Sequence, residues 1–152
     1  MPRIAAVSFF LTVFCLPAQA QQEFQCAGAT VTIGIDTSPP LRSSEGADVI
    51  LRVKRGPRAT VFRYSNVDFV GGGCDTDANN ESRIIYQVVC GGSGCHDLGN
   101  WGVINAQTLQ ALLAPSNDSL EPAIALLGHK PVLKDKLMSV SEAARRAGLI
   151  TP

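Results

Sequence analysis

The chain has 152 residues, with 13 basic and 13 acidic side chains, so it has no formal net charge at neutral pH. This balance argues against a general binder of nucleic acids or other polyanions. The length suits one domain with a genuine core and is too short for two of comfortable size.

The N-terminal segment has the three parts of an export signal. Arg3 supplies a positive charge, a short apolar run follows, and the segment ends in Ala-Gln-Ala20. The apolar run is shorter than the about 20 residues that cross a bilayer. We therefore expect residues 1–20 to be a signal peptide cleaved after Ala20. Residues 21–152 would then be a single soluble domain, periplasmic or secreted, without a transmembrane segment.

The exported part contains four cysteines, Cys26, Cys74, Cys90 and Cys95. An even number of cysteines in an exported chain predicts disulfides. The alternative is a zinc site with His96 as a ligand, but the Cys90-x4-Cys95 spacing is unlike that of zinc sites. Because Cys90 and Cys95 flank a flexible Gly-Gly-Ser-Gly loop, the favoured pairing is Cys90–Cys95 with Cys26–Cys74. We expect no bound metal.

Alternation of apolar and polar residues predicts strands in the first half of the exported chain. Val31, Ile33 and Ile35 lie on one face of residues 30–35. In residues 49–54, Val49, Leu51 and Val53 point inward while Arg52 and Lys54 point outward. Residues 55–58, Arg-Gly-Pro-Arg, are typical of a turn, and residues 59–64 form a return strand. These segments predict a β-hairpin.

Three further segments have the composition of strands. Residues 67–70 extend the sheet, residues 82–90 form its most apolar and therefore central strand, and residues 101–104 end the β region.

The last third of the chain changes to a helical period. Asn105 is expected to cap a helix that runs through Ala114. The capping box at residues 118–121 predicts a second helix that ends at Gly128. The same device at residues 139–142 predicts a third helix.

Together these segments predict an α+β fold stapled by disulfides. A small antiparallel sheet of about five strands would occupy residues 29–104, followed by two or three short helices in residues 105–149. The sequence contains no internal repeat.

Motifs for metal or phosphate binding fail when their spacing is checked. Residues 75–81 resemble the start of a calcium-binding EF-hand loop, but Asn80 replaces the turn glycine and Tyr86 replaces the bidentate acid. The glycine-rich residues 71–73 and 91–94 lack the Gly-Lys-Ser/Thr of a phosphate-binding loop.

A catalytic set is also not found. Cys95, His96 and Asp97 provide the groups of a thiol enzyme, but neighbours on an extended chain point apart. We assign no catalytic residue and expect no cofactor.

A cluster of basic residues gives the best candidate contact surface. No acidic residue interrupts it between Asp48 and Asp68. The candidate binding residues are Arg52, Lys54, Arg55, Arg58 and Arg63. Their positions on one strand face and at the turn predict a single patch for an anionic envelope component or an acidic protein surface. The alternative is that they protect an exposed sheet edge from association.

The sequence thus favours an exported, non-enzymatic binding or inhibitory module of unknown ligand that does not bind nucleic acid. One alternative is a small extracytoplasmic enzyme that uses His96 with a nearby acid. The other is a structural envelope protein.

Overall fold

The computed structural model describes residues 21–38, 47–90 and 99–149. The predicted signal peptide and the segment with Cys95, His96 and Asp97 lie outside these residues.

The described chain forms nine strands and two helices. Sheet A has the order β1-β2-β3-β4 and consists of β1 (Gln22–Cys26), β2 (Ala29–Ile35), β3 (Val49–Arg55) and β4 (Arg58–Tyr64). Sheet B has the order β8-β7-β6-β5-β9 and consists of β5 (Val67–Thr76), β6 (Ser82–Cys90), β7 (Trp101–Asn105), β8 (Ala111–Leu113) and β9 (Met138–Ser139). The helices are α1 (Leu120–Leu127) and α2 (Val140–Arg146).

Sheet A consists of consecutive antiparallel strands, and two-residue turns join β1 to β2 and β3 to β4. The β1–β2 turn has positive φ at both central residues, Ala27 and Gly28, as a type I′ turn requires. The β3–β4 turn has Gly56 with φ 57° followed by Pro57, which fits a type II′ turn. The expected hairpin over residues 49–64 is therefore confirmed.

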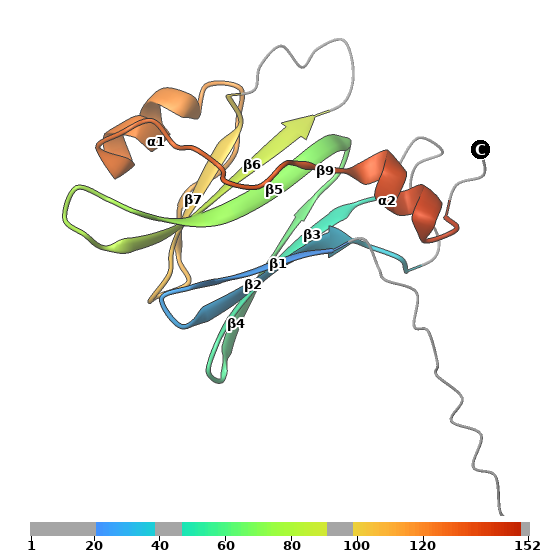
Figure 1. Ribbon diagram of the computed structural model, residues 1–152, viewed down its shortest axis with the longest axis horizontal. Coiled ribbons are helices and arrows are strands. Elements are labelled where there is room, and N and C mark those ends of the chain that lie inside the picture. The colour runs from blue at the N-terminus through green and yellow to red at the C-terminus, as the bar shows by residue number, and fades with distance from the viewer. Residues whose placement is uncertain (1–20, 39–46, 91–98, 150–152) are drawn as a thin grey trace, which may run out of the picture.

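The main core lies between the two sheets, which stack face to face (Figure 1). Alternate residues of β2 and β3, including Val31, Ile33 and Leu51, are fully buried and meet Ile84 and Tyr86 of β6. β6 is the central strand of sheet B, as predicted from its apolar composition.

Close packing of the sheets depends on two residues that lack a side chain. A Cβ on Gly72 would lie 3.0 Å from Ile33 Cδ1 and from the ring of Phe24. A Cβ on Gly102 would lie 2.5 Å from Tyr86 Oη and closer still to two ring carbons. Gly102 thus leaves the space in which Tyr86 lies, and the Tyr86 hydroxyl is 2.7 Å from that of Tyr64 in sheet A.

A disulfide between Cys26 and Cys74 also joins the sheets, linking β1 to β5 with a Cα–Cα distance of 5.1 Å. This confirms one of the two predicted pairings. Cys90 is disulfide-bonded as well, while its predicted partner Cys95 lies outside the described residues.

The outer face of sheet B is covered by α1 and by the segment that follows it. Ala123 and Leu127 of α1 pack on Ile85, Trp101 and Val103 in a second apolar cluster. The chain then crosses β5, forms β9, and enters α2, which contacts β5 and β2 at one end of the molecule (Figure 1). No helix in the described part of the chain is long and apolar enough to cross a membrane.

The predicted single sheet of about five strands is wrong in its arrangement, because the strands divide between two sheets. β1, β8 and β9 also lie outside residues 29–104, where all strands were expected. Alternation shows which side chains face inward, but it does not specify which strands pair. The coarser expectation of antiparallel strands combined with short helices is met.

The helix predicted from Asn105 to Ala114 is wrong. The Asn105 side chain accepts hydrogen bonds from Gln107 N–H at 2.9 Å and Thr108 N–H at 3.0 Å, as a cap would. The chain nevertheless reverses, because Leu109 takes a φ of 64° and Asn105 N–H donates to Gln110 O. Side chains of this type compete with the helix by stabilising local turns, and the returning segment pairs with β7 as β8.

The other two helices are present. α1 ends at Gly128, whose φ is 80°, as predicted, but its N-cap is Ser119 and not Asp118. The Ser119 hydroxyl instead accepts a hydrogen bond from Trp101 N–H at 2.7 Å. α2 begins after Ser139, whose hydroxyl accepts from Glu142 N–H at 3.4 Å, so this predicted cap is confirmed.

Candidate functional site

The outward face of sheet A is the surface that neither helix covers (Figure 1). Its residues fall into three rungs across the strands, each given by the strand register. The first rung is Gln25, Thr30, Lys54 and Ala59; the second is Glu23, Thr32, Arg52 and Val61; the third is Gly34, Ile50 and Arg63. None of these residues is buried. The face is therefore an open, mostly polar platform.

Each of these three rungs carries one cation on β3 or β4: Lys54, Arg52 and Arg63. Lys54 and Arg52 are exposed, and their side chains form no hydrogen bond or ion pair in the part of the chain that the structure describes. Across the sheet, Glu23 on β1 is separated from Arg52 by Thr32 on β2. The positive charge thus gathers on the β3–β4 side of the face.

Arg63 already has a partner in the fold. Its Nη1 lies 2.5 Å from Asp36 Oδ2, and the Arg63 side chain is 59% exposed. A hydrogen bond from Ser38 N–H to the Asp36 carboxylate lowers the pKa of Asp36, and Arg63 lowers it further. Because a guanidinium has five N–H donors, this pair leaves Arg63 able to bind a second anion.

Arg55 and Arg58 have a different role from the other three predicted binding residues. Arg55 donates to the carbonyl of Ala27 and, at 3.4 Å, to that of Ala106. Arg58 donates to the carbonyl of Gln107 at 2.8 Å. These bonds tie the hairpin tip to the β7–β8 turn. The five residues are close in sequence, but the outward face contains only Arg52, Lys54 and Arg63.

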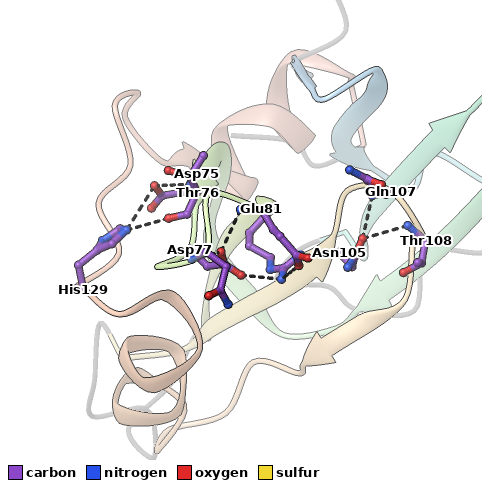
Figure 2. A network of polar contacts seen from close by, with 10 residues as sticks. Asp75, Thr76, Asp77, Glu81, Asn105, Gln107, Thr108 and His129 are labelled. Atoms are coloured by element: carbon purple, nitrogen blue, oxygen red, sulfur yellow. Dashed lines mark hydrogen bonds and ion pairs between the residues drawn. The ribbon is translucent and has the colours of Figure 1, made fainter.

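The loop between β5 and β6 holds a polar network that extends to the start of the 128–137 segment (Figure 2). Asp77 is buried, and its Oδ1 accepts from Asn79 N–H at 2.8 Å and Glu81 N–H at 3.0 Å. Its Oδ2 lies 2.6 Å from Arg83 Nη2, and Arg83 also pairs with Glu81. The Glu81 amide, the Asn79 amide and Arg83 all lower the pKa of Asp77.

This network accounts for the residues that resemble an EF-hand loop. Both oxygens of Asp77 are committed to the loop backbone and to Arg83, and Asn80 takes a φ of 60° at the turn. Within residues 21–38, 47–90 and 99–149, no group of acidic, His or Cys side chains could hold a metal ion. The arrangement supports the interpretation of a structural polar loop.

His129 attaches the end of α1 to β5 (Figure 2). Its Nε2 is 3.0 Å from the Thr76 carbonyl oxygen and 3.6 Å from Asp75 Oδ1, while its Nδ1 is 3.2 Å from the Lys130 carbonyl oxygen. Two carbonyl acceptors favour the doubly protonated ring, since a neutral imidazole has a single N–H. The Thr76 carbonyl, followed by that of Lys130 and the charge of Asp75, raises the pKa of His129.

Cys95, His96 and Asp97, the groups considered for catalysis, lie outside the described residues. What sequence analysis missed is the position of Ala59 and Val61, which place short side chains beside Lys54 and Arg52. The two-residue turn at Gly56-Pro57 could have revealed them, because it pairs Lys54 with Ala59 and Arg52 with Val61.

No protein-family model, curated protein or solved structure matches this chain.

Proposed function

We propose that the chain is an exported binding module whose outward face of sheet A binds an anionic partner. The proposal rests on one observation: three successive rungs of this face each carry a cation near β4. Two of those cations, Arg52 and Lys54, have no partner among the described residues. Unpaired cations on a flat, uncovered face attract anions and steer their approach.

Edge protection explains this pattern only in part. Basic residues that discourage sheet association belong on an edge strand, and Arg63 on β4 meets that description. Arg52 and Lys54 lie on β3, which has β2 on one side and β4 on the other. Because these two cations are not on the unpaired strand itself, edge protection alone does not account for them.

Export is supported by the Cys26–Cys74 disulfide, since disulfides persist mainly in oxidising compartments. It is also supported by the charged, apolar and small-residue parts of residues 1–20. We propose the periplasm or the extracellular space as the site of action.

The test compares two charge reversals that change the net charge equally. The first variant is Arg52→Glu/Lys54→Glu, on the proposed face. The matched control is Lys134→Glu/Lys136→Glu, two exposed residues in the segment that covers sheet B. Binding of fluorescently labelled poly-glutamate is measured by anisotropy at low and at physiological salt.

We expect the first variant to bind about tenfold more weakly than the control, because each exposed ion pair is worth about 0.2–1 kcal/mol. Binding by the unmodified protein should weaken as salt rises, since exposed charges are screened within about 8–10 Å. Equal affinities of the two variants for poly-glutamate would reject the proposed face.

A further inference from the structure

β4 is an edge strand with β3 as its single neighbour in sheet A. Arg55 and Arg58 close a hairpin with a two-residue turn, so they exchange backbone hydrogen bonds, and bonded pairs recur at every second residue of β4. The amides and carbonyls of Ala59, Val61 and Arg63 therefore point away from β3. Among the described residues, no backbone group bonds to them.

The same residues place their side chains on the outward face. Ala59 is directly opposite Lys54, and Val61 is directly opposite Arg52. Because Ala59 and Val61 are short, the longer cationic side chains of β3 can extend over them toward the free edge. The third cation, Arg63, is already on the edge strand. Each of the three rungs therefore has a cation that can reach the free edge of β4.

The spacing of the cations matches that of an extended peptide. Successive rungs are two residues apart, which is about 6.6 Å along a strand. A peptide strand laid beside β4 repeats its outward side chains with the same period. An acidic residue at every second position would therefore meet one cation on each of the three rungs.

We infer that the partner is an extended acidic peptide segment that adds to sheet A along the free edge of β4. Main-chain hydrogen bonds to Ala59, Val61 and Arg63 would supply affinity, and the cations would select acidic side chains. This inference rests on the proposed function and specifies its partner. A second copy of the chain is a poorer occupant, because pairing two β4 strands would join two faces that both carry Lys54, Arg52 and Arg63.

Hydrogen exchange tests strand addition without any substitution. The probe is a peptide that alternates Glu and Val and is as long as β4, and amide exchange is followed by NMR. At saturation we expect exchange of the Val61 and Arg63 amides to slow at least tenfold. The Thr60 and Phe62 amides already bond to β3 and should change little. Unchanged exchange at Val61 and Arg63 with the peptide bound would overturn the inference.

A backbone substitution provides the second test. Val61→Pro removes the edge N–H, and proline is tolerated on an edge strand whose N–H faces solvent. Val61→Ala is the matched control because it shortens the side chain and keeps the N–H. We expect Val61→Pro to bind the Glu–Val peptide at least tenfold more weakly than Val61→Ala, while both bind inorganic polyphosphate equally.

The outcomes separate this inference from the proposed function. If Arg52→Glu/Lys54→Glu weakens peptide binding but Val61→Pro matches Val61→Ala, the proposed anion-binding face stands and strand addition fails. If the charge reversal has no effect, the proposed function itself fails. A dimer of the peptide-free protein with protected Val61 and Arg63 amides would assign the edge to a second copy and overturn the acidic-peptide partner. Should Val61→Pro not fold, hydrogen exchange on the unmodified protein decides.

Discussion

Replacing Gly102 by Ala is expected to be strongly destabilising. The added Cβ would lie 2.5 Å from Tyr86 Oη, and Tyr86 is only 1% exposed, so its ring has little room to move. Overpacking of this kind costs about 1–3 kcal/mol, and displacing the ring breaks the bond to Tyr64, worth about 1 kcal/mol. We therefore expect the free energy of unfolding to fall by about 3 kcal/mol, out of the about 5–15 kcal/mol typical of domains.

Urea denaturation measures this change, and the chain offers a matched control. Gly34 also lies in a strand, but a Cβ there would meet nothing within 4 Å. Gly34→Ala should leave stability unchanged or raise it by about 0.5 kcal/mol, because alanine restricts the unfolded chain.

A double-mutant cycle identifies the cause. In a Tyr86→Leu background the obstructing ring atoms are gone, so Gly102→Ala should cost less than about 1 kcal/mol. If Gly102→Ala costs the same with and without the tyrosine ring, or no more than Gly34→Ala, the steric argument is wrong.

Three further predictions concern the disulfide, His129 and the α2 cap. Replacing Cys26 and Cys74 together by Ala should lower the free energy of unfolding by about 4 kcal/mol, since the bridge spans a sequence separation of 48; a urea midpoint equal to that of the oxidised protein would contradict this. The pKa of His129 is raised, so its contribution to stability is present below the ordinary value of about 6.5 and is lost as pH rises through the folded pKa. An NMR titration giving an ordinary or lowered pKa, or His129→Gln retaining the same pH dependence of stability, would reject the proposed contacts. Ser139→Ala should cost about 1 kcal/mol through loss of the cap, and an unchanged thermal midpoint would show that the cap is dispensable.

The hairpin of β3 and β4 could be predicted because local residues determine it. Val49, Leu51 and Val53 recur at every second position, with Arg52 and Lys54 on the opposite face, and Gly56-Pro57 suits a tight turn. β1 was not predicted because the turn that pairs it with β2 places Ala27 at positive φ, which an alanine seldom adopts. Alternation of apolar and polar residues does not reveal a turn of this kind.

A helix was harder to predict where the same side chain can either cap a helix or stabilise a turn. Asn105 is equally suited to cap a helix and to close a turn. Pairing of Ala111 and Leu113 with β7 decides for the turn. Ser139 ends β9 and caps the helix that follows, and that helix was predicted correctly.

Of the candidate binding residues, Arg52 and Lys54 could be placed on the outward face from their position between buried residues of β3. The bonds of Arg55 and Arg58 could not be foreseen. Their acceptors are backbone carbonyls distant in sequence, including Ala106 and Gln107. Only the approach of the hairpin tip to the β7–β8 turn reveals that these cations serve the fold.

The strand order implies a sequence of events during folding. Every pair in sheet A joins strands that follow each other along the chain, so each hairpin can form with a small loss of loop entropy. Sheet B is completed by strands that are far apart in the sequence, because Ser139 of β9 pairs with Phe69 of β5. We expect sheet A to form early and the pairing of β9 to come late. The outward face of sheet A, which we propose binds anions, would then exist before the segment that covers sheet B has closed.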